Sequence, residues 1–150
     1  MVRNKFLAVL ALVAAVLISR LPAQTPTNTT LTVRVIGARN ANGKIRVALF
    51  RSAEGFPGDP SKASRLERAS IDPQTLSSQV VLTDVPAGQY AVSVFHDENL
   101  NEKLDKNFMG IPKEGYGASN NPGRKMRAPT FDEACFSHQA DQSLEIKLIY

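Results

Sequence analysis

Alternating apolar and polar residues, interrupted by turn-forming residues, constrain the fold of this chain more than any other feature of its sequence. Residues 31–35 and 44–50 both alternate with a period of two, as a half-buried strand requires. Between them, residues 40–43 (NANG) supply asparagine and glycine, which tolerate positive φ angles. Two alternating runs on either side of such a turn predict a β-hairpin.

The rest of the chain contains further short strand-like segments and no long amphipathic helix. We predict strands at residues 78–85, 89–95, 131–136 and 143–150, with a tight turn at residues 86–88. Residues 61–69 leave two alternatives open, a helical turn with Ser61 as N-cap or an irregular edge strand. This organisation predicts an all-β fold, a single immunoglobulin-like or prealbumin-like sandwich of about seven strands with one long polar loop.

The first residues have the layout of a secretory signal peptide, which we assign to residues 1–23. Arg3 and Lys5 give a positive region, the apolar run 6–18 follows, and residues 21–23 offer a small residue before a cleavage point. The apolar run is short for a bilayer span, and a retained N-terminal anchor is the alternative. The sequence therefore predicts an exported protein, periplasmic or extracellular.

Removal of the signal peptide would leave a flexible leader at residues 24–30 and a sandwich domain at residues 31–150, with no stable membrane span. The whole chain has 18 basic and 14 acidic residues. Arg3, Lys5 and Arg20 leave with the signal peptide, so 15 basic and 14 acidic residues remain and the net charge falls to +1. A domain so close to neutral has no electrostatic basis for nucleic-acid binding, and we predict none.

Cys135 is the only cysteine, so the chain cannot form an intramolecular disulfide despite its predicted export. Its stability must come from packing or from a bound ion. Cys135 lies between Ala134 and Phe136, which favours a buried, unreactive thiol. A catalytic pair with His138 would also need an oxyanion or orienting motif, and the sequence has none beside them.

Residues 96–117 form the densest polar stretch of the chain and are the best candidate for a functional site. Aspartate and asparagine alternate at loop positions 1, 3 and 5, and a second aspartate follows at position 9. Calcium binds six to eight oxygen ligands, which these side chains and one backbone carbonyl at position 7 could supply. The candidate calcium ligands are Asp97, Asn99, Asn101, Lys103 (through its backbone carbonyl) and Asp105.

Two residues depart from a complete calcium loop. Glu102 stands where the tight turn favours glycine, and Phe108 stands where a bidentate glutamate normally closes the site. Aspartate and asparagine also cap their own backbone two residues on, so a loop that holds itself without an ion is the alternative. In that interpretation Phe108, Ile111 and Tyr116 fix the loop to the sheet by burial.

Two other interpretations of this region remain open. His96, beside Asp97, would suit a small hydrolase if a cleft brought both together with a third polar group. Only His138 accompanies His96, and no third ligand with diagnostic spacing predicts a zinc site. Basic residues between Lys103 and Arg127 would suit an anionic partner such as a phosphorylated envelope glycan.

The sequence also resembles a known bacterial family. The segment VVLTDVPAGQYAVSVFHDEN has the order strand, Pro-x-Gly turn and Tyr-x-Val strand, as in transthyretin-like and carboxypeptidase-regulatory-like sandwiches. Together with HDENLNEKLDKNFMGIPKEGYG, it makes residues 31–150 similar to the bacterial domain of unknown function family 2141. The resemblance implies an exported β-sandwich and brings no known activity. The loop of that family typically has glycine at the positions of Leu100 and Glu102.

These observations favour an exported, non-enzymatic β-sandwich with a binding or structural role in the cell envelope, acting through residues 96–127. Its partner would be an envelope protein or glycan. The alternatives are a calcium-stabilised scaffold built on residues 97–105 and, less favoured, a small hydrolase that uses His96 and loop carboxylates. Residues 143–150 would form an exposed edge strand, which allows dimerisation by edge pairing and leaves the oligomeric state open.

Overall fold

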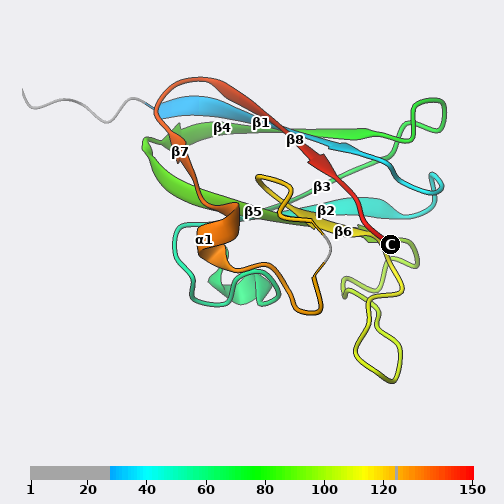
Figure 1. Ribbon diagram of the computed structural model, residues 1–150. Coiled ribbons are helices and arrows are strands. Elements are labelled where there is room, and N and C mark those ends of the chain that lie inside the picture. The colour runs from blue at the N-terminus through cyan, green and yellow to red at the C-terminus, as the bar shows by residue number, and fades with distance from the viewer. Residues whose placement is uncertain (1–27, 124) are drawn as a thin grey trace, which may run out of the picture.

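The computed structural model describes residues 28–150 with the exception of residue 124. Within this part of the chain, eight strands form two sheets that face each other, so the predicted all-β sandwich is confirmed (Figure 1). The predicted signal peptide, residues 1–23, lies outside the described residues. None of the helices described is long and apolar enough to cross a membrane.

The two sheets differ in size and in strand order. The smaller sheet has the order β4-β1-β8, and the larger has the order β3-β2-β5-β6 with β7 paired to β5. The smaller sheet consists of β1 (Asn28–Ile36), β4 (Ser78–Pro86) and β8 (Gln142–Lys147). The larger sheet consists of β2 (Lys44–Phe50), β3 (Arg65–Ala69), β5 (Gly88–Asp97), β6 (Tyr116–Ala118) and β7 (Phe136–His138). The short helical elements are the 3-10 helix η1 (Pro60–Lys62) and the α-helix α1 (Phe131–Ala134).

The period of two in the sequence decides which side chains fill the space between the sheets. In β1, Leu31, Val33 and Val35 are buried, while the polar residues between them face outwards. β1 pairs antiparallel with β4 and parallel with β8, which lies at an edge of its sheet as predicted. The main core contains Leu148, just after β8, and, from both sheets, Leu31, Val33, Val35, Ile45, Val47, Leu49, Val80, Leu82, Val85, Tyr90, Val92, Val94 and Ile146.

The predicted hairpin between residues 31–35 and 44–50 is wrong. Both segments are strands, but β1 pairs with β4 and β8, whereas β2 pairs with β3 and β5. The connection between them crosses from one sheet to the other, and Gly37 turns the chain with a φ of 80°. The turn at residues 86–88 crosses between the sheets in the same way, from β4 to β5 (Figure 1). Alternation around a turn identifies two strands that share a core, and it does not decide whether they hydrogen-bond.

The first strand begins earlier than predicted. β1 starts at Asn28, so residues 28–30, which we assigned to the leader, belong to the strand. Two side chains hold this end, because the Thr30 N–H donates to Asp141 Oδ1 (2.8 Å) and Thr29 Oγ1 lies 2.6 Å from His138 Nε2. Polar threonines therefore continue the strand where composition alone suggested a mobile leader.

Residues 61–69 contain both of the alternatives left open by the sequence. The 3-10 helix η1 comes first and the edge strand β3 follows. The N-cap of η1 is Asp59 rather than Ser61, because the Asp59 carboxylate accepts the Ser61 N–H at 3.0 Å. An aspartate at this position also caps a helix end better than most residues.

The predicted strand at residues 131–136 is wrong in its first part, which forms α1 before β7 begins. Thr130 Oγ1 accepts the Glu133 N–H at 3.4 Å, and Glu133 Oε2 accepts the Thr130 N–H at 2.9 Å. This reciprocal capping box satisfies backbone donors at the start of a helix. Its Thr-x-x-Glu signature is visible in the sequence and would have predicted the helix.

Candidate functional site

The polar loop leaves the sandwich at the end of β5 and returns to the same sheet as β6. Figure 1 shows that this loop extends away from both sheets, near the end of the chain. β6 lies inside the stretch predicted as one uninterrupted loop, and it pairs antiparallel with β5. At Gly117 in β6, a Cβ atom would lie 2.8 Å from Ile146 Cγ2, so only glycine lets β6 approach the end of β8 this closely.

His96, at the end of β5, is fully buried and hydrogen-bonded at both ring nitrogens. Nε2 lies 2.7 Å from the Asn42 carbonyl oxygen, which can only accept, so we assign the ring proton to Nε2. Nδ1 lies 2.7 Å from the Tyr150 hydroxyl, and that hydroxyl accepts the Arg39 N–H at 3.0 Å. Burial raises the pKa of the Tyr150 hydroxyl above its ordinary value. His96 therefore links three segments of the chain as a structural residue.

Asp97, the next residue, is also fully buried and anchors the first half of the loop. Its Oδ1 accepts the Asn101 N–H and its Oδ2 accepts the Glu102 N–H, both at 3.0 Å. Arg46 of β2 completes the group, because its Nε donates to Asp97 Oδ2 at 3.1 Å and its guanidinium also binds Glu102 at 2.7 Å. The hydrogen bond to Glu102, followed by that to Asp97, raises the pKa of Arg46. The buried charge of Asp97 is thus paired and satisfied, as a buried carboxylate requires.

Glu114 is a second buried carboxylate, and it anchors the other half of the loop. Its Oε1 accepts the Glu98 N–H at 2.9 Å, and its Oε2 accepts the Asp105 N–H at 3.0 Å. One side chain therefore joins the outgoing and returning halves of the loop. The sequence did not single out Glu114 for this role, because an isolated glutamate in a polar loop has no local signature.

The structure brings the predicted calcium ligands together, with their oxygens bonded within the loop. Asp105 accepts the side-chain amides of Asn99 (2.7 Å) and Asn101 (2.9 Å). The Asn99 oxygen accepts the Asn101 N–H at 3.1 Å, and the Asn101 oxygen accepts the Lys103 N–H at 2.9 Å. Among the residues described, no group of three or more His, Cys, Asp or Glu side chains is arranged to hold a metal ion. Two of the predicted calcium ligands, Asn99 and Asn101, are asparagines and do not count toward such a group. The calcium site therefore remains a prediction.

The predicted burial of Phe108 and Ile111 against the sheet is wrong. Phe108 is 97% exposed and Ile111 is 45% exposed, while Tyr116 is half-buried in β6. The loop is fixed by hydrogen bonds to the buried carboxylates of Asp97 and Glu114 instead of by apolar contacts. Its apolar side chains are consequently free to face solvent.

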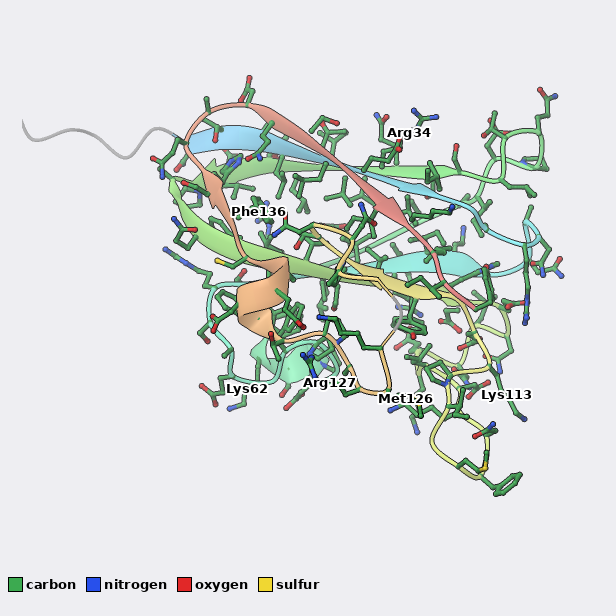
Figure 2. All side chains as sticks on the ribbon, viewed as in Figure 1. Arg34, Lys62, Lys113, Met126, Arg127 and Phe136 are labelled. Atoms are coloured by element: carbon green, nitrogen blue, oxygen red, sulfur yellow. The ribbon has the colours of Figure 1, made fainter. Side chains whose placement is uncertain are left out.

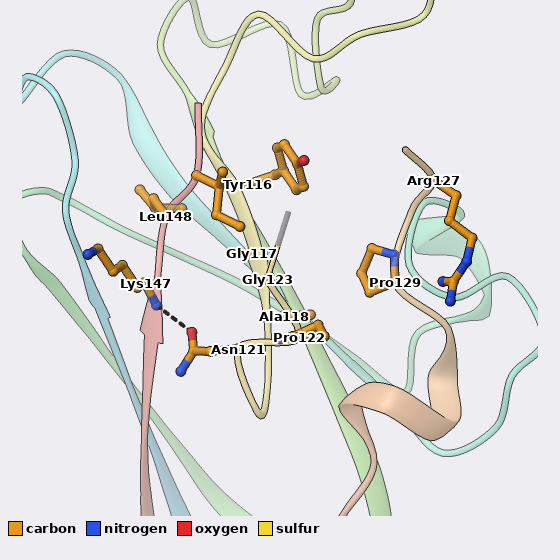
Figure 3. A pocket seen from close by; sticks show the side chains of 11 residues that line it. Tyr116, Gly117, Ala118, Asn121, Pro122, Gly123, Arg127, Pro129, Lys147 and Leu148 are labelled. Atoms are coloured by element: carbon orange, nitrogen blue, oxygen red, sulfur yellow. Dashed lines mark hydrogen bonds between the residues drawn. The ribbon is translucent and has the colours of Figure 1, made fainter. Parts of the chain in front are cut away.

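The cavity beside this region is not lined by the residues that the hydrolase interpretation requires, His96 and Asp97. It has a volume of about 410 Å³ and lies between β6, residues 121–129 and the end of β8 (Figure 3). Neither His96 nor Asp97 lines it. Asn121 closes one side, where its side-chain oxygen accepts the Lys147 N–H at 2.8 Å (Figure 3). A catalytic site built on His96 and Asp97 would require both side chains to leave their buried partners.

In the second candidate pair, the side chains of Cys135 and His138 are each hydrogen-bonded to other residues. Cys135 is half-buried rather than buried, and its Sγ lies 3.5 Å from Gln89 Oε1. His138 is fully buried, with Nε2 against Thr29 Oγ1 (2.6 Å) and Nδ1 against Gln142 (3.3 Å). The two side chains thus bind different partners.

The described basic residues of the region fall into two groups. Lys125 and Arg127 both bind the Glu133 carboxylate, and these partners, Arg127 first, hold the pKa of Glu133 well below its usual range. The second group is exposed and makes no ion pair within the described part of the chain. It consists of Lys103, Lys106 and Lys113. Among the described residues of the region, the unpaired positive charge is therefore on the polar loop.

Comparison with known proteins gives one result. The family model described as an uncharacterized protein conserved in bacteria (DUF2141) matches residues 33–147. This match spans the sandwich from β1 to β8 together with the whole polar loop. No curated protein and no solved structure matches the chain.

Proposed function

We propose that this chain, which belongs to DUF2141, a family of uncharacterized proteins conserved in bacteria, is an exported, non-catalytic binding module. It acts in the cell envelope through the loop region, residues 96–127. One observation carries this proposal: the buried titratable groups of the region are bonded within the fold, Asp97 and Glu114 to the loop backbone and His96 to Asn42 and Tyr150. His96, Asp97 and Glu114 are all buried, and each directs its polar atoms to backbone groups or to neighbouring side chains.

What remains for a partner is the outer surface of the loop. Lys103, Lys106 and Lys113 are exposed there, and so are Phe108 and Met109. A loop already fixed by internal hydrogen bonds loses little conformational entropy when a partner binds. Such a surface is suited to recognition, whereas general acid–base catalysis needs titratable groups that can reach a substrate.

The test is sedimentation with isolated bacterial envelopes, which contain lipid, glycan and protein. It uses residues 24–150, because they include both sheets and the whole described core, and because the apolar run 6–18 would itself bind lipid. We expect these residues to sediment with envelopes. A variant with serine at Lys103, Lys106, Phe108, Met109, Ile111 and Lys113 should stay in the supernatant.

The matched control changes exposed apolar residues outside the loop, Leu66→Ser on β3 and Val81→Ser on β4. It should sediment like the unchanged domain, and far-UV circular dichroism should show every variant folded. Equal sedimentation of the loop variant and the control would refute a binding role for the loop.

We also propose, as a second candidate, that the loop is a calcium-stabilised scaffold. What supports it is that Asp97, Asn99, Asn101 and Asp105 gather in one connected cluster of oxygen-bearing side chains. Arg46 competes with an ion there, because it already pairs with one oxygen of Asp97. Calcium would therefore depend most on the carboxylate of Asp105.

Thermal melting in EDTA and then in millimolar calcium tests this candidate. An ion at 100 times its dissociation constant stabilises a fold by about 2.7 kcal/mol, which raises the melting temperature by several degrees. Asp105→Ala should abolish that increase, while Glu67→Ala, an exposed carboxylate on β3, should retain it. Identical melting of the unchanged domain in EDTA and in calcium would refute the candidate.

A further inference from the structure

The outer end of the polar loop exposes apolar side chains that nothing in the described chain covers. This end, residues 106–113, which we call the tip, extends away from both sheets (Figure 1), and Figure 2 labels Lys113 at one end of it. Phe108 is 97% exposed, Met109 is 64% exposed and Ile111 is 45% exposed. Single exposed apolar residues are common, but a group of them on a projecting turn indicates an interaction site.

The backbone of the tip is hydrogen-bonded within the tip itself. The Asn107 side-chain oxygen accepts the N–H groups of Met109 (2.9 Å) and Ile111 (3.0 Å). The Asn107 N–H donates to the Ile111 carbonyl at 2.8 Å, and the Gly110 N–H donates to the Asn107 carbonyl at 2.9 Å. An apolar medium offers no partner to backbone polar groups, so a segment that enters one has to satisfy them internally. The tip satisfies four of its N–H groups, those of Asn107, Met109, Gly110 and Ile111, without help from another strand.

Lysines surround the apolar side chains of the tip. Lys106 and Lys113 stand at its two ends, and Lys103 lies just before it; all three are exposed and unpaired within the described residues. The two carboxylates next to the tip in sequence are already bonded, because Asp105 accepts two asparagine side-chain amides and Glu114 accepts two backbone N–H groups. The tip thus combines projecting apolar side chains with exposed lysines on both sides of them in the sequence.

We propose that the tip docks the domain on an anionic phospholipid surface. Phe108, Met109 and Ile111 enter the region between headgroups and acyl chains, and the lysines bind the headgroup phosphates. This inference rests on the proposed binding function and names its partner. The shape of the tip favours lipid over a protein partner, because a projecting turn needs a complementary pocket in a protein and needs none in a bilayer.

The absence of tryptophan from the sequence permits a direct test of insertion. Phe108→Trp in residues 24–150 provides a single fluorophore at the outer end of the tip. With vesicles of phosphatidylcholine and phosphatidylglycerol, its emission should shift to the blue and be quenched by lipids brominated on the acyl chains. The control Val81→Trp, on the outer face of β4, should show neither change.

Sedimentation with the same vesicles measures the two contributions separately. Replacing Phe108, Met109 and Ile111 by serine should lower the partition coefficient at least tenfold. Replacing the three lysines by glutamine should lower it by about fivefold for each lysine, roughly 100-fold in total, because each contributes one charge near the surface. Pure phosphatidylcholine vesicles should bind every variant weakly.

The outcomes separate this inference from the proposed function. Sedimentation with bacterial envelopes but not with lipid vesicles would refute lipid docking and leave a protein or glycan partner. Vesicle binding without a blue shift from the tryptophan introduced at position 108 would also refute it, because the tip would then not be the inserted part. Failure to sediment with either would refute both proposals.

Discussion

Glu114 illustrates at the scale of one residue how the loop region is held. Its two carboxylate oxygens accept the N–H groups of Glu98 and Asp105. In Glu114→Gln, the side-chain NH₂ would face one of these donors and leave it unsatisfied. We expect the free energy of unfolding in urea to fall by about 1–3 kcal/mol. Glu67→Gln, an exposed control on β3, should change it little, and an equal loss in both variants would contradict the anchoring role.

Leu100 is a residue whose backbone conformation favours another amino acid. Its φ is +61° and its side chain is 56% exposed, so it adopts a left-handed conformation with little compensating burial. That conformation costs a non-glycine residue roughly 1–2 kcal/mol. Leu100→Gly should therefore raise the free energy of unfolding by about 0.5–1 kcal/mol, after the larger unfolded-state entropy of glycine is subtracted.

Leu66→Gly is the matched control for this prediction, because Leu66 is equally exposed on β3 and has no positive φ. Glycine in a strand interior should lower its stability by about 0.5–1 kcal/mol. Urea unfolding of both variants checks the difference in sign. A loss of stability in Leu100→Gly would show that the leucine side chain contributes more than its exposure suggests.

At the scale of elements, the connection between β1 and β2 depends on the close approach of Gly43 to the end of β5. Gly43 has a φ of +69°, and a Cβ atom there would overlap the Asp97 carbonyl oxygen and lie 2.7 Å from Glu98 Cα. Gly110 has a similar φ of +78°, but no atom lies within 4 Å of a Cβ placed on it. Substitutions at Gly43 and Gly110 therefore distinguish the cost of a left-handed backbone from the cost of steric overlap.

We expect Gly110→Ala to lower the free energy of unfolding by about 1–2 kcal/mol, through the left-handed conformation alone. Gly43→Ala should lower it by a further 1–3 kcal/mol or more, because two backbone segments would have to move apart. Urea unfolding of both variants measures the difference. Equal losses would mean that the strand end moves to accommodate the methyl group.

The elements that the sequence predicted are those with a regular pattern, and its errors have identifiable physical causes. The alternation in residues 31–35 and 44–50 located two strands, but hydrogen-bond pairing depends on the long-range packing of both sheets, which no local pattern contains. The cluster of Asp97, Asn99, Asn101 and Asp105 was located as a polar loop, because these residues bond to nearby backbone. Arg46, at a distance in sequence from Asp97, left no signal.

At the scale of the whole molecule, buried charged side chains connect the polar loop to the sandwich. Asp97 belongs to β5, Arg46 to β2 and Glu114 to the returning half of the loop. Opening the loop would leave the Asp97 and Glu114 carboxylates without their N–H donors, which costs several kcal/mol for a buried charge. A loop of this length would otherwise be expected to fluctuate locally.

Native-state hydrogen exchange at increasing urea concentration tests whether loop and sandwich unfold together. The N–H groups of Asn101, Glu102 and Asp105 bond to the buried carboxylates, so we expect them to exchange with the free energy and urea dependence of the amides in β1. The Met109 N–H, bonded only within the tip, should exchange faster and with little urea dependence. If the first three amides also exchanged independently of urea, the loop would open by itself, and the buried carboxylates would not couple it to the fold.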